Sequence, residues 1–129
     1  MKPDRDIVRC DRGAAAVEFA IVSLILIALC LGIIDFGRGL YLRNNLAFAA
    51  DLGARRILVN PAIADSAVHD AVREGFQGAA DLLQVESGRE TISGIAFRTI
   101  VVSFPLALNV PGLTDSGMTL RVARRVPAT

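Results

Sequence analysis

Residues 12–38 read RGAAAVEFAIVSLILIALCLGIIDFGR, and this stretch decides the fold. Glu18 is the one charged residue within the interval 13–34. As an α-helix, residues 14–34 would be about 31 Å long at about 1.5 Å per residue. That length matches the hydrocarbon core of a bilayer, which is about 30 Å thick. The sequence therefore predicts a membrane-spanning helix with a carboxylate in its first turns, where a charge is costly and points to function.

The composition of the 129-residue chain agrees with one small, membrane-anchored domain. Hydrophobic residues make up 53%, and the apolar excess lies largely in this N-terminal block. The net charge of +1 indicates no clustered basic face for nucleic acid. Two cysteines, Cys10 and Cys30, exclude a disulfide scaffold. A lipoprotein signal at Cys30 is disfavoured because the bulky Leu29 precedes it.

Two other targeting signals compete for the apolar block. A cleaved secretory signal fits less well, because the run is long and LGIID at residues 31–35 contains no small-x-small cleavage site. A plain signal anchor remains open. Basic residues before the run favour a cytoplasmic N-terminus. We therefore expect a cytoplasmic leader at residues 1–13, a transmembrane helix at 14–34 and an extracytoplasmic α+β domain at 35–129.

Beyond the span, the pattern predicts that the first helix continues to about Leu58. One face carries apolar or small side chains at helical spacing: Leu42, Leu46, Ala49, Ala50, Gly53 and Ile57. Asp51 and Arg55 are spaced as an i,i+4 ion pair on another face. Asp35 and Arg38 are expected at the water boundary, and Tyr41 as an interfacial anchor.

A second amphipathic helix is expected at residues 62–83. Asn60 is a good N-cap, and Pro61 suits the first position of a helix. An apolar stripe runs through the segment, with polar residues mostly opposite it. Gly75 and Gly78 weaken its middle.

The C-terminal part changes to the two-residue period of β-strands. Residues 84–91 are polar and contain Gly88, which indicates a turn. Residues 95–102 alternate as one strand that Pro105 ends, and residues 118–123 as a second. A loop with Pro111 and Gly112 is expected between them. The predicted fold is α+β, with a long N-terminal helix, a second helix, and an antiparallel hairpin or small sheet that the helices cover.

The sequence contains no recognisable catalytic set. The single histidine, His69, is expected on the solvated face of a helix, without the companions that a metal site or a general base needs. No phosphate-binding loop, dinucleotide fingerprint, nucleophile elbow or HExxH motif is present. We predict no enzyme activity, no cofactor, no metal, no small-molecule substrate and no nucleic-acid partner.

The segment RGAAAVEFA at residues 12–20 resembles the processing site of type IV pilin-like proteins, and more closely that of the TadE family of tight-adherence (Flp) pilus systems. Further TadE-like features are IIDFGR at residues 33–38 and AADLGAR at 49–55. The resemblance is strong from about Arg12 to Arg55 and weak beyond. Phe19 follows Glu18 where major Flp pilins usually have tyrosine, which favours a minor, TadE-like role.

The resemblance implies that a prepilin peptidase cuts after Gly13, so that Ala14 becomes the first residue and Glu18 the fifth. The new α-amino group at Ala14 would be protonated at neutral pH and could pair with a Glu18 carboxylate. Glu18 and Phe19 would then serve recognition or assembly. The implied partners are the peptidase, other minor pilins and the inner-membrane pilus platform, with the protein in the bacterial inner membrane and possible pilus association.

The sequence is therefore consistent with two functions. In the first, the protein is a TadE-like minor pilin or pseudopilin that helps assemble a Flp-type pilus. In the second, it is an uncleaved, single-pass anchor for an exported binding or structural domain, with Glu18 facing headgroups at the bilayer boundary. A small exported enzyme is disfavoured for lack of catalytic residues.

Overall fold

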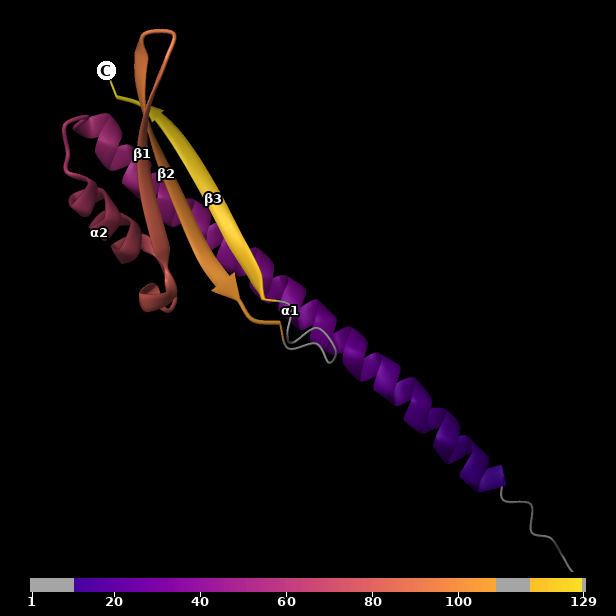
Figure 1. Cartoon of the computed structure of the whole chain (residues 1–129). Coiled ribbons are helices and arrows are strands. Elements are labelled where there is room, and N and C mark those ends of the chain that lie inside the picture. The colour runs from indigo at the N-terminus through magenta and orange to yellow at the C-terminus, as the bar shows by residue number, and fades with distance from the viewer. Residues whose placement is uncertain (1–10, 109–116, 129) are drawn as a thin grey trace, which may run out of the picture.

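The computed structural model describes residues 11–108 and 117–128 (Figure 1). Its elements are α1 (Asp11–Val59), α2 (Asp65–Gly75), a short 3-10 helix η1 (Ala80–Leu82), β1 (Gln84–Ile92), β2 (Ile95–Leu106) and β3 (Met118–Pro127). The predicted α+β class is confirmed. The predicted leader, apart from its last residues, and the loop with Pro111 and Gly112 lie outside the described residues.

Helix α1 is unbroken for 49 residues, or about 74 Å. Its first half projects alone, and its second half lies along the sheet and α2 (Figure 1). The predicted apolar face is confirmed, because its residues are buried in the domain core. Gly53 allows the closest approach: a Cβ there would lie 2.6 Å from Val72 Cγ2 and 3.2 Å from Ile100 Cδ1.

The sheet is antiparallel, with strand order β1-β2-β3. Helices α1 and α2 cover one face of it, and its other face carries mostly charged and polar side chains, with Phe97 and Val101 among them. The core is closed by fully buried side chains from every layer: Leu46, Ile57, Val68, Val72, Ile100 and Val102. Such a one-sided sheet explains the alternation of buried and exposed positions along β2 and β3.

Strand β1 was missed, because the predicted turn at residues 84–91 is wrong. The true turn is Ser93-Gly94, where both residues have positive φ (53° and 83°), as a type I′ hairpin requires. Ile92 pairs with Ile95 across it. The sequence signal for β1 was weak because its pattern is mostly polar, but the Ser93-Gly94 dipeptide was available to mark the hairpin.

The predicted end of β2 at Pro105 is also wrong, since the strand runs to Leu106. Pairing with β1 stops at Ser103, whereas Pro105 still pairs with Thr119 of β3. Pro105 therefore has no partner strand on one side, where a missing N–H group is tolerated.

The second helix is shorter than predicted at both ends. The Asn60 side chain accepts a hydrogen bond from Ala62 N (3.1 Å) and forms a turn, so α2 begins at Asp65 with Ala64 as its N-cap. At the other end, Phe76 is extended (φ −87°, ψ 122°) and its ring packs on Phe104, with ring centroids 5.2 Å apart. This aromatic contact and Gly75 end the helix before residue 83.

Two polar contacts tie these layers together. The Arg98 guanidinium is buried on the core side of β2, where it pairs with Asp65 and donates to the carbonyl oxygens of Pro61 (3.2 Å) and Ile63 (2.9 Å). It thus fixes the α1–α2 connection to the sheet. His69 is half-buried and its Nε2 lies 3.2 Å from Ser87 Oγ of β1, so it does not lie on the solvated face of the helix, as was expected.

The expected Asp51–Arg55 ion pair is replaced by a longer-range one. Arg124 of β3 donates through Nε to the Asp51 carboxylate at 2.5 Å. This hydrogen bond raises the pKa of Arg124. Helix spacing made Arg55 the nearest candidate in sequence, but the sheet brings the Arg124 guanidinium to the same carboxylate.

Candidate processing and assembly site

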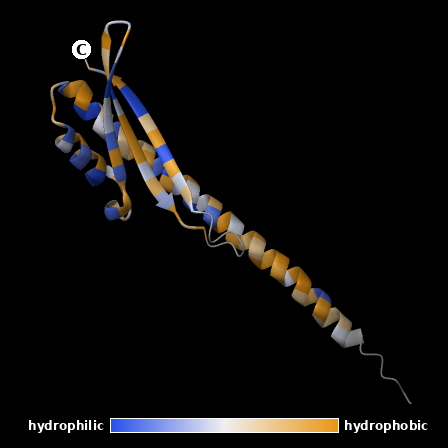
Figure 2. Ribbon diagram, viewed as in Figure 1, coloured by the Kyte–Doolittle hydropathy of each residue, from blue (hydrophilic) through white to orange (hydrophobic). Residues whose placement is uncertain are grey.

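Apart from Glu18 and Ser23, the first half of α1 is apolar or small on every side, and most of it is coloured as hydrophobic in Figure 2. The candidate site lies at its start. From residue 13 to residue 34, almost every side chain is exposed. The helix is long and apolar enough to cross a membrane. A helix that is hydrophobic on every side needs lipid or neighbouring helices around it, and this domain supplies neither along that length.

Gly13 and Ala14 lie in the first turns of α1, which begins at Asp11. Both are exposed, and a Cβ at Gly13 would meet nothing within 4 Å. The peptide bond between them is therefore open to a protease on its outer side. Because the bond is helical, a protease that grips the backbone must first open this turn, and helix ends open at low cost.

Glu18 stands four residues after Ala14, on the same face of the helix and about 6 Å further along its axis. Its neighbour Phe19 is 73% exposed. All four predicted site residues thus lie within the first few turns of one helix.

The remaining polar group within the span is satisfied locally. Ser23 Oγ donates to the carbonyl oxygen of Ala20 at 2.9 Å. A hydroxyl bonded back to its own helix carries little cost in lipid. Glu18 is therefore the one side chain in residues 13–34 that calls for an ionic partner.

Asp35 differs from its expected place at the open water boundary. It is 6% exposed and lies beside the ends of β2 and β3, whereas Arg38 is exposed. The ends of these strands reach the first charged turn after the span, which sequence reasoning missed. The contact joins α1 to strand ends that are far away in the chain, so no local pattern indicated it.

Among the described residues, no group of three or more His, Cys, Asp or Glu side chains is placed to hold a metal ion. His69 contacts Ser87 of β1 and belongs to no such group in the part of the chain that the structure describes. The feature that remains for function is the exposed start of α1.

These features define a membrane-anchored, single-pass protein with a small α+β domain. Residues 13–55 match the family model described as TadE-like protein, which confirms the resemblance over this segment. No curated protein and no solved structure matches the chain. The matched segment begins at Gly13 and covers about a third of the chain, including the site residues and Gly53. It supports a pilin-like protein associated with a Tad pilus.

Proposed function

We propose that this protein is a TadE-like minor pilin or pseudopilin, processed after Gly13 and active in assembly of a Flp-type pilus. The observation that carries the proposal is the TadE-like match starting at Gly13, on a helix whose first half is left uncovered. The protein is then the substrate of a prepilin peptidase and not itself an enzyme. Its N-terminus faces the cytoplasm, and its α+β domain faces outward from the inner membrane.

Cleavage after Gly13 places a charged amino group at the N-terminus of the apolar helix. Removal of residues 1–13 leaves an α-amino group at Ala14, one helical turn before Glu18. Two parallel subunits displaced by about 6 Å along their axes bring the amino group of one beside the carboxylate of the other. This pairing offsets the cost of the charge in lipid and sets the register between subunits. The partners in this arrangement are other minor pilins and the inner-membrane pilus platform.

The processing step is tested by expressing the full chain with a prepilin peptidase and measuring the intact mass of the membrane form. We expect a species that begins at Ala14. Gly13→Leu should abolish it, whereas Gly37→Leu, at another helical glycine with open surroundings, should not. An intact Met1 species in every case would overturn processing.

The role of Glu18 is tested by its neutral analogue. Glu18→Gln should lose co-purification with the pilus platform or minor pilins while keeping the same fold. Glu86→Gln, an exposed position on the domain, is the matched control. Equal assembly of the two variants would show that no ionic pairing at Glu18 is needed.

An uncleaved anchor is the second candidate, and one observation favours it. The bond between Gly13 and Ala14 lies inside α1 and not in an extended segment. In that case Glu18 faces headgroups at the bilayer edge, and the mass of the membrane form stays that of the whole chain.

A further inference from the structure

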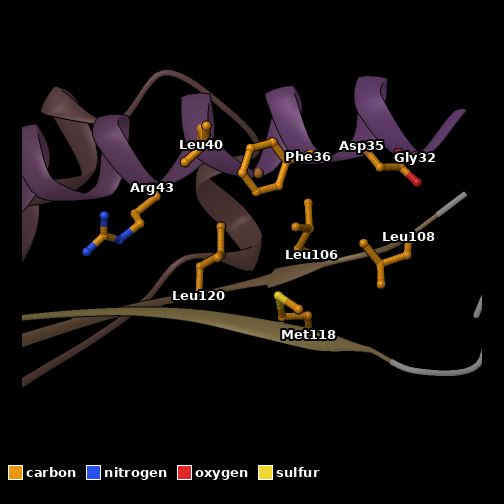
Figure 3. A pocket seen from close by; sticks show the side chains of 10 residues that line it. Gly32, Asp35, Phe36, Leu40, Arg43, Leu106, Leu108, Met118 and Leu120 are labelled. Carbon is orange, nitrogen blue, oxygen red and sulfur yellow. The ribbon is translucent and has the colours of Figure 1, made fainter. Parts of the chain in front are cut away.

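The end of the α+β domain nearest the span carries an apolar groove between α1 and the sheet. It has a volume of about 360 Å³. One wall is formed by Gly32, Phe36 and Leu40, and the other by the ends of β2 and β3 with Leu106 and Met118 (Figure 3). Met118 is 51% exposed. Apolar side chains that line an open hollow favour an apolar occupant.

A second hollow of about 380 Å³ lies near the same end of the domain. Tyr41, Leu82 and Ala107 are among the residues that line it, and Arg38 also lies at its edge. Leu82, from η1, is 52% exposed. Exposed apolar side chains therefore occur beside two hollows at this end; we call Phe36, Leu40, Tyr41, Leu82 and Met118 the membrane-proximal rim.

The height of the rim above the span follows from the helix. Because α1 continues without a break through residue 59, the position of the domain along the helix axis is fixed. Phe36 and Tyr41 lie two to seven residues past Ile34, which is about 3 to 10 Å along the axis. Each headgroup layer of a bilayer is about 5 to 8 Å thick. When residues 14–34 fill the hydrocarbon core, Phe36 therefore lies within the headgroup layer and Tyr41 just beyond its outer edge.

The charges near the rim suit the same depth. Arg38 and Arg43 are exposed on the turns of α1 that carry the rim, where guanidinium groups can bind lipid phosphates. Tyrosine is favoured at this level because its ring is apolar and its hydroxyl polar. The apolar rim residues, the tyrosine and the two arginines are the residue types that are common on protein surfaces lying in a membrane interface.

We propose that the membrane-proximal rim inserts into the headgroup layer of the bilayer that α1 spans, so that the domain rests on the membrane surface. The occupant of the two hollows is phospholipid. This inference rests on the membrane anchor of the proposed function and holds whether or not the leader is cleaved. A domain held in this way points its β1–β2 hairpin tip away from the bilayer (Figure 1).

The test uses the absence of tryptophan from the chain, so that each variant has a single tryptophan. Full-chain Met118→Trp is reconstituted in phosphatidylcholine–phosphatidylglycerol vesicles, with and without lipids brominated near the carbonyl end of the acyl chain. Ile92→Trp, at the hairpin tip, is the matched control. We expect a blue-shifted emission for Met118→Trp that loses most of its intensity to brominated lipid, and no such loss for Ile92→Trp.

Further variants keep the outcomes distinct. Leu82→Trp probes the second hollow and replaces Met118→Trp if that variant misfolds. Ile25→Trp probes the span. Quenching of Ile25→Trp without quenching at Met118 or Leu82 would overturn the rim proposal alone, whereas failure of all three would also remove the anchor. A blue shift at the rim that brominated lipid does not quench, and that disappears on dilution into excess lipid, would assign the hollows to a second copy of the chain and overturn the proposal.

Discussion

The two halves of α1 are continuous in backbone and opposite in environment. Residues 13–34 are apolar on every side and exposed, whereas residues 35–59 bury one face under α2 and the sheet. The first half is rich in Leu, Ile and Val, while the buried face of the second uses small residues such as Ala49, Ala50 and Gly53. The difference shows that a helix with large apolar side chains on every face needs lipid or other subunits around it. A helix with small residues along one face can instead pack closely against other elements of its own domain.

The sharpest way to break this comparison is to remove the same side chain from each half. Ile57 is fully buried, and Ile25 is 65% exposed. Ile57→Ala should lower the free energy of unfolding of the domain by about 4 kcal/mol through lost burial and a cavity. Ile25→Ala should leave it unchanged, as measured by urea titration of the full chain in detergent micelles. Equal losses would mean that the first half also packs on the domain.

A smaller effect is expected from adding bulk at a glycine in each half. Gly53→Val should cost about 2 kcal/mol, because its Cβ would clash with Val72 and Ile100. Gly32→Val should cost the domain nothing, since a Cβ there meets nothing within 4 Å. The same urea titration separates them. A tolerated Gly53→Val would show that α1 and α2 are less closely packed than described.

The smallest effect concerns the surface of the packed half. Arg124→Ala should lower stability by about 0.5 kcal/mol by removing the ion pair with Asp51, less so at high salt. Arg55→Ala, at the partner that helix spacing suggested, should have no effect beyond the helix preference for alanine. If Arg55→Ala were the more costly, the sequence-based pairing would be the true one.

The features of the single helix α1 could be predicted from the sequence, whereas the contacts between distant segments could not. The length of α1 and its buried face followed from hydropathy and spacing, because the pattern is long and strongly periodic. Strand β1 was missed because most of its side chains are polar and Gly88 suggested a turn. The contacts of Arg98, His69 and Asp51 join residues distant in the chain, and no local pattern specifies such partners.

The same distinction holds for the candidate site, where some features followed from the sequence and others depended on the tertiary structure. The sequence placed Gly13, Ala14, Glu18 and Phe19 together, because they are near neighbours on one helix, and the TadE-like match covers them. The burial of Asp35 and the apolar rim around Phe36 and Met118 could not be foreseen. They depend on where the ends of β2 and β3 meet α1.

The sequence by itself determined the apolar anchor helix and the α+β class, because hydrophobic length and period act locally along the chain. Only the tertiary structure decided how far the domain reaches down α1 towards the membrane. That height is set by packing around Gly53 and by the register of a three-stranded sheet, and both depend on residues far apart in sequence.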